Sequence, residues 1–363
     1  MIVIFGAGVI GLFSAYTLLK KGKKVKIFDT NEIKGNSTDA SVGMLAPLIE
    51  AKPQESKLFR LMLKSKRIWE TFGEKENKLE FELKNNASLM IALNKDDKEK
   101  LKFKQNFFKT LGFETKLLNV DETLKIEPSL NSNIECSLYC QGQDQLNPIL
   151  LKKFLIREIF KMGGEIKKVK RIKKIFFKEN KVLFNQEELE FEKIIIACGA
   201  WSNEIINKSF GISIPLRPLK GISMIVESSG ETFSHNLWFR NIYIAPRKKK
   251  ILAIGATEEE KGFDNSVTID EVYFLTRSIW ESLPQIEKFK LKKINVGLRP
   301  TVVDGNPIIG PLEKAKPNIL CNFGHYRHGI LLAPISAEII SRYVLNEHVS
   351  KEYKFFSPSR FNL

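Results

Sequence analysis

Hydrophobic and polar positions at the start of the chain follow the order strand, turn, helix, strand. Residues 2–5 are four consecutive apolar residues, which predict a buried strand. The uncharged stretch 12–19 predicts a helix, and a second apolar strand is predicted over 25–28, where it ends at the acid Asp29. This order is the supersecondary context that a dinucleotide-binding turn requires.

Three glycines separate the first strand from the helix at the spacing of that turn. Gly6 permits the tight turn, Gly8 lets the backbone approach a pyrophosphate, and Gly11 lets the helix pack against the strand. The N-terminus of the helix presents N–H groups and a partial positive charge to the phosphates. Asp29 can accept the ribose hydroxyls, and its charge argues against a 2′-phosphate. The pattern predicts a dinucleotide site rather than an empty βαβ unit, and it leaves NAD and FAD open.

Later hydrophobic patterns predict further helices and strands. Helices are predicted over 56–84, 96–116, 147–162, 269–283 and 333–345, and strands over 87–93, 172–178, 181–184, 190–197, 222–227, 238–246, 251–256 and 319–323. The run 193–201 predicts a buried strand entering a glycine turn. Its uniform apolarity after Lys193 is typical of a parallel strand covered on both faces, so we expect it in the same sheet as 2–5. Residues 297–300, rich in Gly and Pro, are predicted to form a turn.

These elements predict an α/β fold with a discontinuous, Rossmann-like nucleotide-binding domain and a second α+β domain for the substrate. The strand-rich region 216–296 indicates that the second domain is built on a mostly antiparallel sheet. We expect residues 1–84, 146–215 and 297–363 in the nucleotide-binding domain, and residues 85–145 and 216–296 in the substrate domain.

Composition narrows the choice of partners. The net charge of +16 comes from 58 Lys and Arg against 42 Asp and Glu, but the basic runs are scattered and lie between apolar strands. We therefore expect solvated faces that attract small anions, and no nucleic-acid partner. The four cysteines include no Cys-x-x-Cys pair, so neither a zinc site nor a disulfide framework is expected.

The sequence predicts neither a signal peptide nor a membrane-spanning helix. The apolar stretch 2–19 resembles a signal peptide, but a basic start does not precede it. No stretch has the roughly 18 apolar residues of a membrane span. We expect a soluble, cytoplasmic protein in a reducing compartment.

Several blocks together resemble the D-amino acid oxidase family of FAD-dependent oxidoreductases, and within it the glycine oxidase group of thiazole (thiamine) synthesis. The resemblance extends over nearly the full length in the right order. It is carried by the opening FGAGVIG with Asp29, Ser37 to Pro47 with its GMLAP block, Ile194 to Trp201, Tyr243 to Arg247, Gly255 to Thr257, Gly297 to Pro300 with Asp304-Gly305, and Gly324 to Pro334.

The resemblance implies that the cofactor is FAD rather than a nicotinamide. It implies that Val9 and Ile10 lie along the pyrophosphate and that Asp29 and Thr30 lie at the adenosine ribose. The other residues that it places at the cofactor are Gly6, Gly8, Gly11, Ser37, Thr38, Val42, Gly43, Met44, Ile172, Gly199, His325, Tyr326, Arg327, His328, Gly329, Ile330 and Leu331. His325 and His328 are three residues apart, but nothing nearby completes a metal site, so no metal is expected.

An amino acid substrate requires a group that holds its carboxylate. Arginine is suited to this because its planar guanidinium makes two parallel bonds to a carboxylate. Position alone leaves Arg299 and Arg327 open between substrate contact and structural ion pairs, and it leaves Tyr243 open between a second donor and a core tyrosine. The resemblance favours substrate contact.

The resemblance implies hydride transfer from the substrate Cα to flavin N5, hydrolysis of the imine to oxo acid and ammonia, and reduction of oxygen to hydrogen peroxide. No acid–base residue is expected, since the chemistry depends on positioning and exclusion of water. Small substrates such as glycine or sarcosine are implied, and a homo-oligomer is possible. Two alternatives stay open. One is a D-amino acid or sarcosine-type dehydrogenase of the same fold that passes electrons to a quinone or carrier, and the other, suggested only by the charge of +16, is a flavin-bearing protein that serves binding or tRNA modification.

Three departures from the family pattern concern residues near the expected site. Asn295-Val296 precede Gly297 where a tryptophan and a small residue are usual, and His328 stands where an asparagine is common. Asp29 replaces the usual glutamate. The first two bear on substrate preference.

Overall fold

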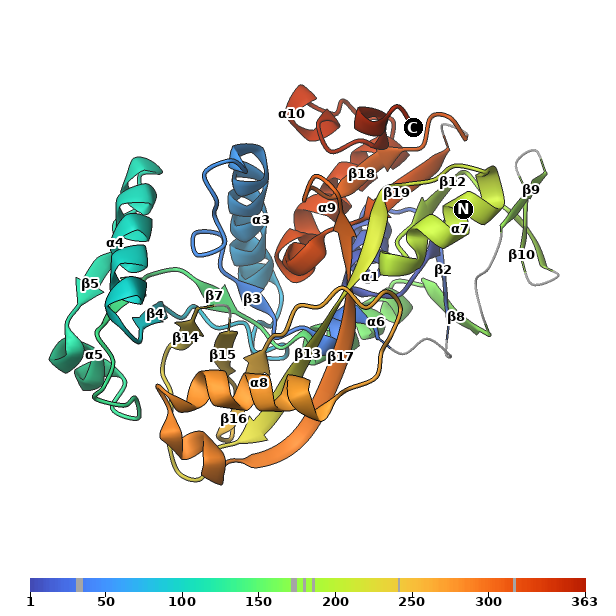
Figure 1. The fold of residues 1–363 in the computed structure, drawn as a ribbon. Helices are drawn as coiled ribbons and strands as arrows, with labels where there is room; N and C mark the ends of the chain where they lie inside the picture. The colour runs from blue at the N-terminus through green and yellow to red at the C-terminus, as the bar shows by residue number, and fades with distance from the viewer. Residues whose placement is uncertain (31–34, 171–174, 179–180, 185–186, 241, 316–317) are drawn as a thin grey trace.

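The computed structural model describes residues 1–363 apart from 31–34, 171–174, 179–180, 185–186, 241 and 316–317. Two sheets organise this part of the chain (Figure 1). The first is parallel except for its edge strand β18, and it runs in the order β18 (Ile308–Pro311), β19 (Ile319–Phe323), β12 (Lys193–Ile196), β1 (Ile2–Phe5), β2 (Val25–Thr30), β8 (Glu165–Val169). The expectation that the 193–196 strand lies in the same sheet as the opening strand is confirmed, and the two strands pair directly.

Both faces of this first sheet are covered, as uniformly apolar strands require. Ile2 and Ile4 pack into a core shared with the helices α1 (Val9–Lys20), α3 (Ser56–Lys75), α6 (Pro148–Lys161) and α9 (Gly329–Val344). Val3 and Phe5 point to the other face, where α7 (Ser202–Phe210) and the small sheet of β9 (Phe176–Lys178), β10 (Lys181–Phe184) and β11 (Glu187–Glu190) lie. Alternate residues of one strand therefore supply two separate cores.

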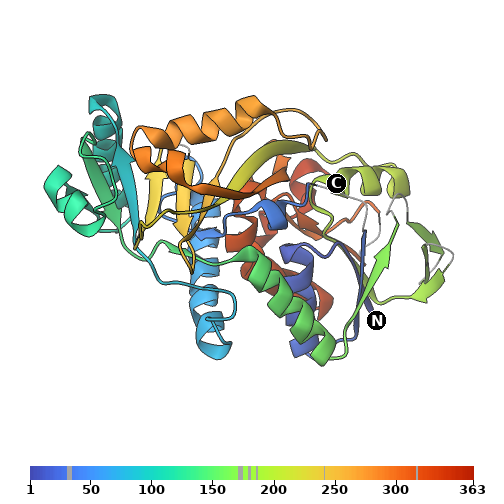
Figure 2. The ribbon, with the colours of Figure 1, turned by 90° about the horizontal axis from the view of Figure 1, so that it is seen from below.

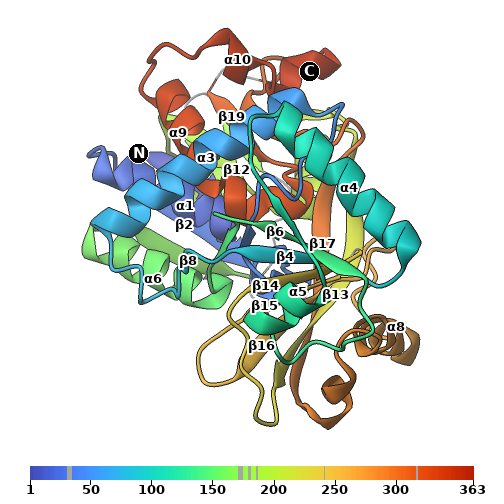
Figure 3. The same ribbon diagram turned by 90° about the vertical axis from the view of Figure 1, so that its left-hand side faces the viewer.

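The second sheet is antiparallel except where β14 pairs with β4. Its order is β17 (Lys290–Val302), β13 (Leu216–Glu227), β16 (Ile251–Gly255), β15 (Ile242–Pro246), β14 (Asn236–Phe239), β4 (Ser88–Ala92), β6 (Cys136–Cys140), β5 (Lys116–Leu118). One face packs against Leu275 and Ile279 of α8 (Ile269–Trp280), which lies alongside the sheet in Figures 1 and 2. At the far end, α4 (Lys95–Thr110) and α5 (Val120–Ile126) flank β4 to β6 (Figure 3).

Shorter elements complete the described chain. They are α2 (Ser37–Ala40), β3 (Met44–Leu45), which pairs with β7 (Asp144–Gln145), α10 (Lys351–Lys354), and the 3₁₀ turns η1 (Gly199–Trp201), η2 (Pro284–Lys288), η3 (Tyr326–His328) and η4 (Pro358–Phe361). Among the described residues, no helix combines the length and the apolarity needed to cross a membrane.

Two predicted helices end earlier than their hydrophobic patterns indicated. The helix expected over 56–84 ends at Lys75, because the chain turns at Asn77, whose side chain accepts from Leu79 N, and then brings Phe81 into the core against Phe72. The helix expected over 96–116 ends at Thr110. Gly112 has a φ of +83°, which stops the helix, and β5 follows.

Two predicted strand and turn assignments were also wrong. The strand expected over 238–246 is a hairpin of β14 and β15, in which Arg240 adopts a φ of +51°. Residues 297–300 are not a turn but part of the long strand β17. Pro300 pairs with Pro218 of β13, and proline is tolerated in β17 because β17 is an edge strand. We expected the boundary between the two domains at residue 296, but β17 continues across it. The division into domains stays a proposal.

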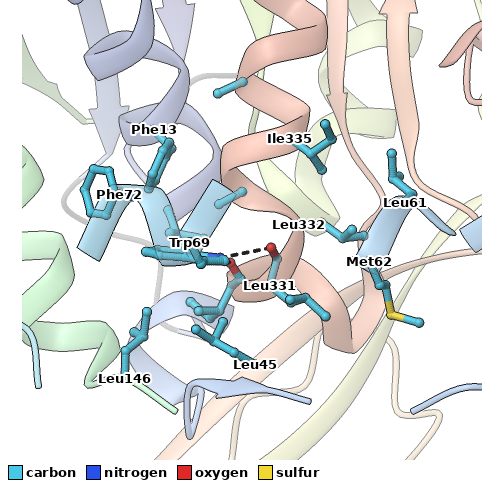
Figure 4. Packing of buried hydrophobic residues seen from close by; sticks show 14 of the residues in the cluster. Phe13, Leu45, Leu61, Met62, Trp69, Phe72, Leu146, Leu331, Leu332 and Ile335 are labelled. Atoms are coloured by element: carbon cyan, nitrogen blue, oxygen red, sulfur yellow. Dashed lines mark hydrogen bonds between the residues drawn. The ribbon is translucent and has the colours of Figure 1, made fainter. Parts of the chain in front are cut away.

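The closing helix α9 starts at Gly329 instead of Ala333, and it contains Pro334. Proline lacks the N–H that would bond to the carbonyl four residues earlier. Trp69 Nε1 donates to that carbonyl, of Ile330, at 3.2 Å and to the Leu331 carbonyl at 3.0 Å (Figure 4). Ser65 Oγ also donates to Leu331 O. Side chains of α3 thus replace the helix bond that the proline removes.

Candidate active site

A cleft opens where the carboxyl ends of β1, β2, β12 and β19 meet the inner face of the second sheet. This edge of a parallel sheet is where doubly wound folds bind ligands. Its empty space amounts to about 1370 Å³, counted together with its open mouth. The predicted site residues on its wall are Gly6, Gly8, Val9, Ile10, Asp29, Thr30, Ser37, Thr38, Gly199, Tyr243, Arg299, His325, Tyr326, Arg327, Gly329 and Ile330.

The glycine turn after β1 is required by packing at two of its three positions. Gly6 has a φ of +106°, and a Cβ there would lie 2.3 Å from the carbonyl oxygen of Ala197. A Cβ on Gly11 would lie 1.9 Å from the carbonyl oxygen of Gly6. At Gly8, by contrast, the nearest atom to an added Cβ would be Thr38 Oγ1 at 3.4 Å, so protein atoms do not fill the space over this residue. Backbone atoms of the protein therefore pack closely against the turn at Gly6 and Gly11, whereas the space over Gly8 is left free.

The first turn of α1 directs backbone donors toward this opening. Val9 N donates to Thr38 Oγ1 at 3.0 Å, which ties the helix start to α2. The N–H groups of Ile10 and Gly11 belong to the same turn and have no partner within the helix. Together with the helix dipole they make a place for an anion.

Asp29 and Thr30 stand at the end of β2 on the same wall. Asp29 Oδ2 accepts from Lys168 Nζ at 2.7 Å, and Thr30 Oγ1 donates to the carbonyl of Lys170 at 2.9 Å. Asp29 lines the cleft, and Lys168 of the neighbouring strand β8 holds its carboxylate in place.

Two buried polar atoms on the cleft wall have no hydrogen-bond partner within the described protein. They are Nδ1 of His325 and Oδ1 of Asn322. His325 Nε2 is fixed by Ser336 Oγ at 2.8 Å, and Asn322 Nδ2 donates to Ser14 Oγ at 3.0 Å. Burial lowers the pKa of His325 to about 3, so the imidazole is neutral at physiological pH. Buried polar atoms normally have partners, so these two indicate a polar ligand.

At the other end of the cleft, the second sheet contributes Tyr243 from β15 and Arg299 from β17. Both point to the face opposite α8. Ile244, next to Tyr243, and Val296, three positions before Arg299, pack on the α8 side, and side chains alternate between the faces of a strand. Arg299 Nη1 donates to the carbonyl of Thr257 at 3.0 Å. A Cβ on Gly221 would lie 2.3 Å from Arg299 Nη1, so the glycine makes room for the guanidinium across the strand pair.

Arg327 lies on the loop between β19 and α9 and forms an ion pair with Glu50. Its Nη2 is 2.8 Å from Glu50 Oε2 and 2.9 Å from Oε1. The charge of Glu50 raises the pKa of Arg327 further above its ordinary value. The adjacent Tyr326 has a φ of +50°, and its hydroxyl donates to Glu258 Oε2 at 2.6 Å. Left-handed backbone at a non-glycine residue is strained, and such strain often occurs at functional sites.

The structure does not place all predicted site residues on the cleft wall. The residues that do not line it are Gly11, Val42, Gly43, Met44 and Leu331, and His328 lines an adjoining polar cavity together with Tyr326. Ile172 lies outside the described residues.

Sequence reasoning missed several residues that line the cleft. Asn322 had a recognisable signal, a polar residue inside the apolar strand 319–323. Glu50, which does not line the cleft but pairs with the cleft residue Arg327, had no such signal, because Arg327 is 277 positions away. The other cleft residues that were not predicted are Asn36, Ala40, Ser41, Ala197, Cys198, Trp201, Ile205, Gly221, Ile222, Ala256, Gly297, Pro300 and Phe323.

Comparison with known proteins agrees with this geometry. A family model described as FAD dependent oxidoreductase (DAO) matches residues 1–343. A glycine oxidase from Bacillus licheniformis is 27% identical over 97% of this chain and 94% of the relative. The bifunctional protein ThiO/ThiG of Trichormus variabilis is 27% identical, covering 99% of this chain and 55% of that protein. The crystal structure of glycine oxidase from Geobacillus kaustophilus superposes with a TM-score of 0.91 at 24% identity, covering 99% of this chain and 98% of that one.

Proposed function

This chain belongs to the DAO family of FAD dependent oxidoreductases, and from that membership we propose that it oxidises glycine or a similarly small amino acid or secondary amine with oxygen as acceptor. The observation that carries the proposal is that Arg299 and Tyr243 of the second sheet line the same cleft as the dinucleotide-binding turn. Similarity to glycine oxidases over almost the whole chain supports the substrate class.

The residues on the cleft wall fit FAD. The open space over Gly8 and the free donors of the first turn of α1 suit a pyrophosphate. Asp29 suits the ribose hydroxyls. His325 Nδ1 and Asn322 Oδ1, which have no partner among the described residues, can each form a hydrogen bond with a polar atom of the cofactor. We propose that these residues hold it, with Val9, Ile10, Thr38 and Gly329 along its length.

Arg299 and Tyr243 are the residues that we propose for the substrate carboxylate. A guanidinium makes charge-assisted bonds to a carboxylate, and a tyrosine hydroxyl can add a third. Burial raises the pKa of Tyr243 despite the opposing charges of Arg299 and Arg327, so its hydroxyl keeps its proton as a donor. Fixing the carboxylate at these two side chains fixes the position of the substrate Cα.

The chemistry that bound FAD supplies is acceptance of a hydride from the substrate Cα, followed by return of the electrons to oxygen. The chain's part is to orient the substrate and to exclude water from the Cα. Neutral His325 adds no positive charge to the cleft, and we assign no proton transfer to it.

Placement in the thiazole branch of thiamine synthesis is also part of the proposal. The relative named ThiO/ThiG joins a segment like this chain to further sequence, which supports the link. The alternative function, a dehydrogenase that passes electrons to a quinone or carrier, would use the same cofactor and substrate residues.

The test is a visible spectrum of the purified protein, followed by anaerobic addition of glycine, sarcosine and D-alanine. We expect flavin bands that bleach with glycine or sarcosine and recover in air with release of peroxide. Bands that bleach but do not recover in air indicate the dehydrogenase. Bands that never bleach contradict the proposed substrate class.

A further inference from the structure

The two guanidinium groups on the cleft wall have different electrostatic surroundings. Arg327 is paired with Glu50 through both carboxylate oxygens, at 2.8 and 2.9 Å. Arg299 makes no ion pair with any residue that the structure describes, and its bonds go to the carbonyls of Thr257 and Lys220. One arginine is therefore neutralised by the protein, whereas the other keeps an uncompensated charge.

Glu50, the partner of the cleft residue Arg327, is a largely buried anion. Only 13% of its side chain is exposed, and Lys104 of α4 lies close by, donating to the carbonyl of the adjacent Ile49 at 3.3 Å. Burial alone would raise the pKa of Glu50, but Arg327, His328 and Lys104 outweigh it, and the net shift is downward. The carboxylate therefore persists at neutral pH.

Both arginines line the same cleft as Tyr243, and Glu50 is held against one of them, Arg327. Tyr243 is close enough to all three that each shifts the pKa of its hydroxyl, the arginines downward and Glu50 upward. A substrate whose carboxylate lies between Arg299 and Tyr243 therefore has the Arg327–Glu50 pair as its neighbour. A second carboxylate on that substrate would meet an arginine that is already neutralised, together with an anion.

We propose that Glu50 restricts this site to amines that carry a single carboxylate, because it occupies Arg327 and leaves Arg299 as the guanidinium that receives the substrate. This inference rests on the proposed function and names its substrate class: glycine and N-alkylglycines such as sarcosine are accepted, whereas dicarboxylic amines such as iminodiacetate are rejected. Glu50 is thus a specificity-determining residue rather than a catalytic one.

The central experiment compares wild type with Glu50→Gln. The substitution keeps the size of the side chain, removes its charge and frees the Arg327 guanidinium. We expect the ratio of kcat/KM for iminodiacetate to that for sarcosine to rise about ten- to a hundred-fold, the range of one charge-assisted bond. An unchanged ratio overturns the proposal.

Two further variants show whether the effect passes through Arg327. In Glu50→Gln/Arg327→Gln the gain should disappear, and a gain that persists there overturns the proposal. Glu55→Gln is the matched control, since Glu55 lies on the same segment and pairs with the exposed Lys52 at 3.0 Å. It removes the same charge and should leave the ratio within about twofold, the range of ordinary surface substitutions.

A binding measurement keeps the inference separate from the proposed function. Acetate and malonate are titrated into the wild-type holoprotein at pH 8, and the perturbation of the flavin bands reports each Kd. We expect acetate to bind at least about ten-fold more tightly; equal or tighter binding of malonate overturns the inference even if Glu50→Gln does not fold. If sarcosine and glycine fail to reduce the flavin while acetate still binds preferentially, the proposed reaction is wrong and the selectivity stands.

Discussion

At the scale of single residues, three positions in the cleft leave an atom, a charge or a space free for a ligand. Arg299 has no acidic partner among the described residues, and His325 Nδ1 has no hydrogen-bond partner there. Gly221 has no side chain, which lets the Arg299 guanidinium lie over the backbone of β13. These omissions leave charge, donors and space available to ligands.

Replacing Arg299 tests its role as the carboxylate ligand. In Arg299→Ala the substrate loses one charge-assisted pair, worth about 1.5–3 kcal/mol, so Kd should rise roughly ten- to a hundred-fold. The measurement is an acetate titration that follows the flavin bands. Arg217→Ala is the control, because Arg217 is exposed and pairs with Glu260 at 3.0 Å at the surface. Equal affinity in Arg299→Ala and wild type would remove Arg299 from the substrate site.

The lowered pKa of His325 makes the free energy of unfolding depend on pH. Its pKa is about 3 in the folded protein because of burial, against about 6.5 in an unfolded chain. As the pH falls below 6.5 the unfolded state takes up a proton that the native state refuses, so stability falls toward acid. Between pH 7.5 and 5.5 this one group should remove about 1.4 kcal/mol of the free energy of unfolding.

His325→Gln should reduce that loss by the same amount in urea unfolding at the two pH values. His348→Gln, at an exposed histidine, is the control and should leave the pH dependence as in wild type. A pH dependence that His325→Gln leaves unaltered would contradict the assignment.

At the scale of elements, α9 depends on α3. Pro334 removes the helix bond to the Ile330 carbonyl near the cleft. Trp69 of α3 donates to this buried carbonyl and to that of Leu331, and Ser65 donates to the Leu331 carbonyl as well. Figure 4 shows Trp69 lying against this turn, with Phe13 and Phe72 around it. Because Gly329 and Ile330 line the cleft, the contact also holds part of the site in place.

Trp69→Phe keeps most of the ring but removes the donor. The Ile330 carbonyl then stays buried without a partner, and a small cavity remains, so we expect a loss of about 2–4 kcal/mol in the free energy of unfolding. Urea denaturation of the holoprotein measures it. Trp280→Phe is the matched control at a tryptophan that is 51% exposed, and it should cost less than about 0.5 kcal/mol. Similar costs for both variants would show that the carbonyl contact contributes little.

At the scale of the whole molecule, two sheets and their helical layers meet at one cleft. The first sheet supplies the dinucleotide end and the second supplies the proposed carboxylate end. On the far side of the second sheet, Lys220 of β13 contacts Glu271 of α8 at 2.7 Å, and both side chains are buried. Lys220 precedes Gly221, so this ion pair joins the outer helix to the strand on which Arg299 rests.

Breaking that pair should destabilise the whole protein. Lys220→Met leaves Glu271 buried without its partner, with an expected cost of about 3–5 kcal/mol. Lys220→Met/Glu271→Gln removes both charges and should recover a large part of the loss, because an apolar or neutral pair avoids the desolvation of an isolated ion. Thermal and urea unfolding of the two variants measure the difference. A double variant no more stable than the single one would contradict the coupling.

Local signals in the sequence were sufficient for much of the fold. The turn from β1 through Gly6, Gly8 and Gly11 into α1, the start of α6 at Asn147-Pro148, and the buried strand at 193–196 were predicted and are confirmed. Each of them depends on residues that are close in sequence, where steric demands and hydrophobic periodicity act directly. The resemblance to the family, carried by such blocks, is confirmed as well.

Tertiary structure alone decided which distant residues face one another. It placed Arg299 on an edge strand instead of a turn, and it paired Glu50 with Arg327 across 277 positions. It also placed Asn322 beside Ser14, 308 positions away. An ion pair or a hydrogen bond requires two groups at about 3 Å, whatever their separation along the chain. The sequence by itself therefore determined many of the elements and the cofactor class. The ends of two helices, the strand that contains Arg299 and the arrangement of charge around the proposed substrate site followed from tertiary structure.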